Sequence, residues 1–126
     1  VPDDGSGRVA AITPELPADY FESGHRVWEH VLRLIVLSRA ERAAWGAVPV
    51  AQRRTWLLAR TAAKDAVRMF LASAYDLRVG AADIDLEPEG ADHFVPLGSW
   101  LSRIPVTPRV AIHWRDQRAV ATLLVS

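Results

Sequence analysis

Apolar residues in the first third of the chain repeat at helical spacings. Val27, Val31, Leu34 and Ile35 recur every three or four positions, which predicts a helix over residues 24–37. The segment Ser38-Arg39-Ala40-Glu41 then has the pattern of a capping box, in which Ser38 caps a new helix and Glu41 reaches back to it. We therefore expect a short second helix to about Trp45 and interpret Glu41 as a cap rather than a ligand.

The longest helical pattern covers residues 50–74. An apolar stripe at alternating spacings of three and four is formed by Trp56, Ala59, Ala63, Val67, Phe70 and Ala74. Arg60, Lys64, Asp65 and Arg68 lie off this stripe on neighbouring turns. We expect these four side chains to converge at one spot, at the rim of the buried face of the helix.

After Gly80 the repeat changes from the helical period to the period of two that is typical of strands. Strands are predicted over residues 82–87, 93–97, 109–114 and 118–125, with a weaker edge strand at 8–12 and a short helix near Trp100. Helices that precede strands favour an α+β fold in which a long helix packs on a small, mostly antiparallel sheet.

The last predicted strand is apolar on both faces. Ala119, Ala121, Leu123 and Val125 alternate with Val120, Thr122 and Leu124, which predicts a central or interface strand. Such a strand needs cover, so we expect self-association or a missing partner half. Residues 1–18 contain three prolines and two glycines and are predicted to be a flexible tail or linker, which leaves residues 19–126 as one domain.

Composition excludes several functional classes. The 126 residues carry fifteen acidic and fifteen basic side chains, and a nucleic-acid-binding domain is usually basic. The longest apolar run, residues 34–37, is too short to cross a membrane. The absence of cysteine excludes thiolate chemistry and fits a reducing compartment, and the sequence opens without a secretion leader. We therefore expect a cytoplasmic protein that acts on neither nucleic acid nor membrane.

Lys64 is the only lysine, because fourteen of the fifteen basic side chains are arginine. Lysine is a compact point charge that suits a phosphate, whereas arginine is a planar fork. Lys64 and the adjacent Asp65 are therefore the first candidates for chemistry. The alternative is that Asp65 and Arg68, three positions apart, only form a surface ion pair and that one lysine remains by chance of composition.

The segment from Trp56 to Ala66, which ends in Ala-Ala-Lys-Asp-Ala, resembles the signature helix of the 4′-phosphopantetheinyl transferase superfamily. Three further segments match in order: Leu37-Ser38-Arg39-Ala40-Glu41, the strand at 82–86, and residues 109–114 followed by 119–121. The resemblance covers residues 25–126 and is greatest to the transferase-like domain at the carboxyl end of polyketide-type synthases.

The resemblance implies a function. A phosphopantetheinyl transferase moves 4′-phosphopantetheine from coenzyme A to a serine of an acyl carrier protein or domain, with Mg²⁺. By resemblance, Asp65 and Lys64 would be the catalytic residues. Coenzyme A would be bound by Arg60, Lys64, Arg68 and His113. Mg²⁺ would be held by Asp65 together with Asp19 or Glu22.

The sequence also departs from the family pattern. The Gly-x-Asp-x-Glu strand that supplies further magnesium ligands is absent, the signature glutamate is Asp65, and the Ser-x-Ser-His segment reads Ala111-Ile112-His113-Trp114. An alternative function therefore stays open, in which the chain is a non-catalytic structural or docking domain of a polyketide-type synthase. A third alternative is a coenzyme A or nucleotide binder without transfer activity.

Overall fold

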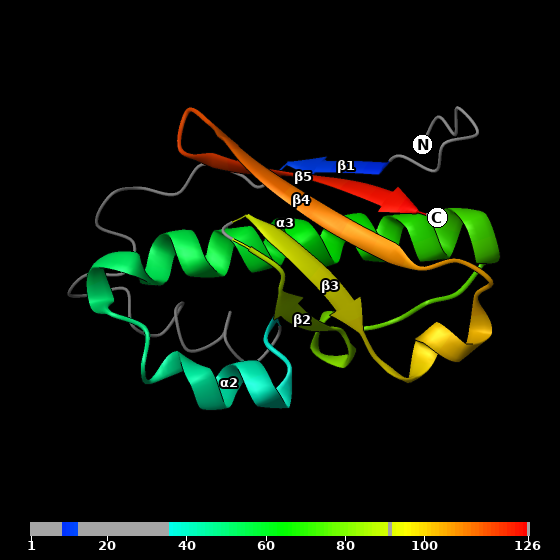
Figure 1. Cartoon of the computed structure of the whole chain (residues 1–126), viewed down its shortest axis with the longest axis horizontal. Coiled ribbons are helices and arrows are strands. Elements are labelled where there is room, and N and C mark those ends of the chain that lie inside the picture. Colours follow the sequence, from blue (N-terminus) through cyan, green and yellow to red (C-terminus); the bar gives the residue numbers. More distant parts are fainter. Residues whose placement is uncertain (1–8, 13–35, 91, 126) are drawn as a thin grey trace.

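The computed structural model describes residues 9–12, 36–90 and 92–125 (Figure 1). The helical elements are α2 (Arg39–Trp45), α3 (Val50–Tyr75) and the two 3₁₀ turns η1 (Ala81–Asp83) and η2 (Ser99–Arg103). The strands are β1 (Val9–Ile12), β2 (Asp85–Pro88), β3 (His93–Leu97), β4 (Pro108–Arg115) and β5 (Arg118–Val125).

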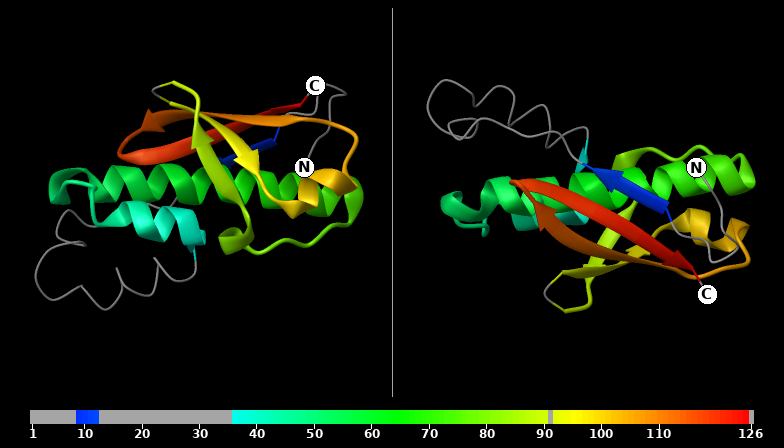
Figure 2. Two further views of the ribbon diagram at one scale, coloured as in Figure 1. Left: turned by 60° about the horizontal axis from the view of Figure 1, so that its bottom comes forward. Right: turned by 90° about the horizontal axis from the view of Figure 1, so that it is seen from above.

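The strands form one sheet in the order β1-β5-β4-β3-β2, and every neighbouring pair is antiparallel. The long helix α3 runs along one face of this sheet, and α2 lies beside the first half of α3 (Figures 1 and 2). The predicted α+β fold is thereby confirmed. The last strand, β5, lies between β1 and β4, so the prediction of a central strand is also confirmed.

The core lies between α3 and the inner face of the sheet. Ala62, Ala63 and Ala66 are fully buried on the helix and let its backbone approach the strands closely. The facing residues from β4 and β5 are Val110, Ile112, Ala119, Ala121 and Leu123. A second, smaller cluster joins α2 to the first turns of α3 and contains Val36, Leu37, Trp45 and Leu57, with Trp56 packed against it.

Most predicted elements agree with the structure. The capping box at Ser38, both helices from residue 39 onward, the strands near 93–97, 109–114 and 118–125, and the short helix at Trp100 are confirmed. The edge strand expected at 8–12 is present over 9–12. The helix predicted for 24–37 and the boundary predicted at residue 18 lie outside the described residues, apart from Val36 and Leu37.

Two details of the prediction are wrong. The strand expected from residue 82 begins only at Asp85, because β3 ends at Leu97, the residue opposite Asp85, and leaves the preceding residues without a partner strand. Ala81–Asp83 instead forms the turn η1. In α3, Ala74 is exposed although it was placed on the buried stripe. No described helix is long and apolar enough to cross a membrane.

Gly98 occupies a position where a side chain does not fit. A Cβ atom built there would lie 2.3 Å from the indole nitrogen of Trp100 and 2.7 Å from the main-chain oxygen of Asp83. We expect Gly98→Ala to lower the free energy of unfolding by about 1–3 kcal/mol, because the core must shift to admit the methyl group. Urea denaturation followed by tryptophan fluorescence measures the change.

Gly46→Ala is the matched control for this prediction. No heavy atom lies within 4 Å of a Cβ at Gly46, whose backbone is in the right-handed helical region. Alanine should therefore be neutral or stabilise the protein by up to about 1 kcal/mol. Equal effects of the two substitutions would contradict the steric explanation.

Candidate functional site

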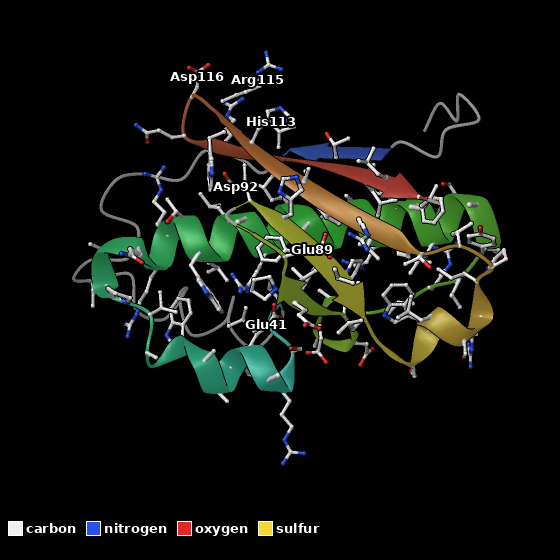
Figure 3. All side chains as sticks on the ribbon, in the orientation of Figure 1. Glu41, Glu89, Asp92, His113, Arg115 and Asp116 are labelled. Atoms are coloured by element: carbon white, nitrogen blue, oxygen red, sulfur yellow. The ribbon has the colours of Figure 1, made fainter. Side chains whose placement is uncertain are left out.

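The first helical turn of α2 places Glu41 beneath α3 (Figure 3). The main-chain amide of Ser38 donates to Glu41 Oε1 at 3.0 Å, and the amide of Glu41 donates to the Ser38 hydroxyl at 3.3 Å. These reciprocal bonds satisfy amides that have no partner within the helix. They also fix the direction of the Glu41 carboxylate, which is 5% exposed and faces the interior.

Lys64 is buried in the core of the protein. Its side chain is 0% exposed, and its ammonium donates to Glu41 Oε1 and, at 2.6 Å, to the main-chain oxygen of Val36. Burial lowers the pKa of Lys64, and the Glu41 carboxylate opposes this shift, with a smaller contribution of the same sign from Asp85. The one lysine of the chain thus links α3 by hydrogen bonds to Val36, which precedes α2, and to Glu41 in the first turn of α2.

Arg60 is the second cation on the same carboxylate. Its Nε lies 3.1 Å from Glu41 Oε2, and its guanidinium carbon lies 3.8 Å from the centre of the Trp56 ring and 5.1 Å from that of Phe94. A guanidinium over an aromatic face gains a cation–π attraction. Arg60 is 8% exposed, and burial lowers its pKa while Glu41 raises it. Glu41, Arg60 and Lys64 form a nearly buried cluster, named here the Glu41 triad.

Asp65 and Arg68 lie on another side of α3. Both side chains are about half exposed, at 49% and 48%, and Arg68 Nη1 lies 3.9 Å from Asp65 Oδ1. Arg68 also donates from Nε to the main-chain oxygen of Val79 at 2.9 Å, which holds its side chain in place. Partial burial raises the pKa of Asp65, and the charge of Arg68 opposes the shift.

The expectation that Arg60, Lys64, Asp65 and Arg68 converge at the rim of the buried face is therefore wrong. Lys64 belongs to the buried face itself, and with Arg60 it contacts Glu41, whereas Asp65 and Arg68 form a separate pair at the surface. Successive residues on a helix are about 100° apart, so the adjacent Lys64 and Asp65 point in different directions.

Of the remaining predicted site residues, only His113 lies in the described part of the chain, and it joins neither group. His113 is exposed on β4 and lies near the β4–β5 turn with Arg115 and Asp116, far from Glu41 (Figure 3). Asp19 and Glu22 lie outside the described residues. Among the residues that the structure does describe, no three histidine, cysteine, aspartate or glutamate side chains are close enough to hold a metal ion.

The partnership of Glu41 with the cations of α3 was not predicted from the sequence. Glu41 was interpreted as a cap, which it is, but its carboxylate also binds Lys64 and Arg60, residues 23 and 19 positions further on. The available indication was Lys64 itself, which follows two alanines and precedes Asp65 and another alanine. If such a lysine is buried it needs a buried acid, and Glu41 occurs in the preceding element.

Mg²⁺ fits the described residues only in part. Asp65 is the single acidic residue of α3, and Arg68 rather than a second carboxylate lies beside it. Mg²⁺ is commonly held by one or two carboxylates together with substrate phosphates and water. Asp65 by itself would therefore hold Mg²⁺ only together with further ligands from a substrate phosphate and water.

Comparison with solved structures shows which proteins share this fold. The structure of a holo-(acyl-carrier-protein) synthase from Bacillus anthracis str. Ames in complex with CoA (3′,5′-ADP) aligns with 95% of this chain and 95% of that chain, with a TM-score of 0.65 and 16% identity. The structure of the holo-ACP-synthase from Plasmodium yoelii aligns with 96% of this chain and 94% of that chain, with a TM-score of 0.61 and 15% identity. No family model and no curated protein sequence matches the chain. At these identities the likeness establishes the fold.

Proposed function

We propose that this chain transfers 4′-phosphopantetheine from coenzyme A to a serine hydroxyl of an acyl carrier protein or domain. The observation that carries the proposal is the fold, which is shared over almost the whole length with holo-ACP synthases, one of them in complex with CoA. The Ala-Ala-Lys-Asp-Ala segment of α3 supports it independently. We further propose that the chain is a terminal domain of a polyketide-type synthase and acts in the cytoplasm.

Asp65 and Arg68 are the residues that we assign to the reaction. The serine Oγ forms a bond to the phosphorus next to pantetheine, the bond from that phosphorus to the bridging oxygen breaks, and adenosine 3′,5′-bisphosphate leaves. Asp65 is exposed enough to accept the serine proton, and its raised pKa makes it a better base than an ordinary aspartate. Arg68, held by Val79, is placed to bind phosphate oxygens.

Mg²⁺ would supply charge neutralisation at the pyrophosphate. Asp65 would hold it in this chain, and Asp19 and Glu22 remain candidates as further ligands. Lys64 and Arg60 take a different role in this proposal from the one that the resemblance implies. Because both cations bind Glu41, they position α2 and α3 instead of contacting phosphate.

The proposed site needs a second copy of the chain or a partner half. Asp65 and Arg68 lie at the surface of one copy, and His113 lies near the β4–β5 turn and pairs with neither of them. A neighbouring copy would bring His113, or residues like it, against Asp65. The apolar outer face of β5, where Leu124 is 44% exposed, supports this association.

The test is incubation of the chain with an apo acyl carrier protein, coenzyme A and Mg²⁺, followed by mass spectrometry of the carrier. We expect the carrier to gain the mass of one 4′-phosphopantetheine group per reactive serine. A carrier whose reactive serine is replaced by alanine is the control. A well-folded sample that leaves several carriers unmodified would reject transfer.

A structural or docking domain is the second candidate function. It is favoured by the Glu41 triad, in which the lysine of the signature segment is fully buried and already hydrogen-bonded. Calorimetry with coenzyme A and Mg²⁺ separates the candidates, because a purely structural domain binds neither. Binding of coenzyme A without transfer would instead support a nucleotide binder.

A further inference from the structure

A pocket of about 420 Å³ lies between α2, the first half of α3 and the edge of the sheet at β2. Its apolar walls include Trp56 on α3, Leu86 on β2 and Leu97 on β3, with the small side chains of Ala40 and Ala44 on α2. We name it the α2–β2 groove. The groove is bounded by the helix α2 on one side and by the edge strand β2 on the other side.

The β2 side of the groove offers main-chain hydrogen-bonding groups. The amide of Glu89 donates to the oxygen of His93 at 2.9 Å, so the alternation of an antiparallel ladder makes Glu87 and Asp85 the next hydrogen-bonded positions. Leu86 and Pro88 then direct their main-chain groups away from β3. Because β2 is an edge strand of the described sheet, the Leu86 amide and carbonyl face the groove.

The rim of the groove carries unpaired acidic side chains. Asp85 and Glu87 line it, both are exposed, and within the described part of the chain no hydrogen bond or ion pair joins either side chain to another residue. Residues 79–92 contain five acids and no lysine or arginine. Arg60 also lines the groove, but Glu41 already pairs with it. The charge that remains free at the rim is negative.

We propose that the α2–β2 groove binds an extended peptide segment of a partner protein, which adds to the sheet as a strand beside β2. Such a strand would exchange main-chain hydrogen bonds with Leu86, place an apolar side chain over Trp56 and Leu97, and set an arginine or lysine against Glu87 or Asp85. Strand addition gives affinity through the main chain, and the groove and its rim give specificity.

This surface is distinct from the proposed transfer site. Arg60, which lines the groove, and Asp65 are five residues apart on α3 and therefore lie about 140° apart around the helix. Binding of a peptide in the groove does not require transfer activity. A partner could occupy the groove while Asp65 stays accessible.

The experiment uses the full chain labelled with ¹⁵N and two blocked six-residue peptides. The first alternates arginine with leucine, and the second has glutamate in place of each arginine. We expect the arginine peptide to shift the NMR signals of the Leu86 amide and the Trp56 indole, and to slow exchange of the Leu86 amide with solvent. The glutamate peptide should bind at least about threefold more weakly.

Three variants locate the binding. Ala44→Trp fills the groove and should abolish binding. Glu87→Lys reverses the rim charge and should weaken the arginine peptide about threefold to tenfold while strengthening the glutamate peptide. Asp92→Lys makes the same charge change on an exposed residue that does not line the groove, so it should have a smaller effect. Glu87 is exposed, so Glu87→Lys decides the question if Ala44→Trp fails to fold.

Three results would overturn the proposal. The first is slow exchange of the Leu86 amide in the free protein, which would mean that the chain itself covers this edge. The second is equal binding of the two peptides. The third is a response to Asp92→Lys as large as the response to Glu87→Lys, which would indicate a diffuse attraction to all the acidic residues of segment 79–92.

Discussion

Glu41→Gln is expected to lower the free energy of unfolding by about 3–5 kcal/mol, the cost of leaving buried charge without its partner. Glu41 is the carboxylate that Lys64 and Arg60 share, and all three residues are less than 10% exposed. Glutamine keeps the size of the side chain and the capping box, because its amide oxygen still accepts from Ser38. The substitution therefore removes the charge and replaces the oxygen that faces Arg60 with an amide nitrogen that cannot accept a hydrogen bond.

Urea denaturation monitored by tryptophan fluorescence measures this effect. Trp45 and Trp56 pack edge to face, with their ring centroids 5.5 Å apart, and Trp56 also contacts Arg60 of the triad. The fluorescence of these two residues therefore reports on this region. Glu87→Gln is the matched control at an exposed position and should change the stability by less than about 0.5 kcal/mol. A loss below about 1 kcal/mol for Glu41→Gln would contradict the buried triad.

A second substitution tests the same explanation by replacing Lys64, the partner of Glu41. Lys64→Met in the Glu41→Gln background removes the unpaired ammonium and replaces it with an apolar side chain of similar length. The double variant should be more stable than Glu41→Gln alone, because apolar groups can replace a buried ion pair at little cost. A double variant less stable than Glu41→Gln alone would indicate that packing of the lysine stem, not the charge of its ammonium, is the important feature.

Asp65→Asn is expected to reduce the transfer rate constant kcat/KM by about 10²–10⁴-fold, the usual contribution of a general base. The fold should be unaffected, with a change in stability within about 0.5 kcal/mol, because the Asp65 side chain is 49% exposed. Mass spectrometry of the carrier over time measures the rate. Asp76→Asn is the control: Asp76 is 91% exposed beyond the end of α3, in a left-handed conformation that asparagine tolerates.

The pH dependence of transfer follows from the same residue. Partial burial raises the pKa of Asp65 above 3.8, so the folded protein keeps this proton at a higher pH than the unfolded chain does. Ionisation of Asp65 therefore opposes folding slightly as pH rises, and the ionised form needed for catalysis is lost as pH falls through the raised pKa. We expect kcat/KM to fall at acid pH as Asp65 takes up its proton, and an acid limb that survives in Asp65→Asn would assign it to another group.

The sequence predicted the secondary structure of the described residues well because local rules govern it. The Ser38 capping box, the 26-residue helix α3 and the alternation of β5 each depend on residues that are neighbours in the chain. The resemblance of the segment from Trp56 to Ala66 to a signature helix also predicted this fold, which the solved structures of holo-ACP synthases share. The start of β2 was not predicted correctly because it depends on the partner strand. Residues before Asp85 have no partner, since β3 ends at Leu97, and the position of that end is not encoded in the residues of β2.

The sequence alone also established that Lys64 is exceptional, since it is the only ammonium among fourteen guanidinium groups, and that Asp65 follows it. Only the tertiary structure decided that these neighbours have different surroundings. Burial depends on which element packs over a helix face, and α2 covers Lys64 with the Glu41 carboxylate from 23 residues away while Asp65 stays half exposed. The physical reason is that pairing of a buried charge is a long-range contact, and spacing along one helix contains no information about it.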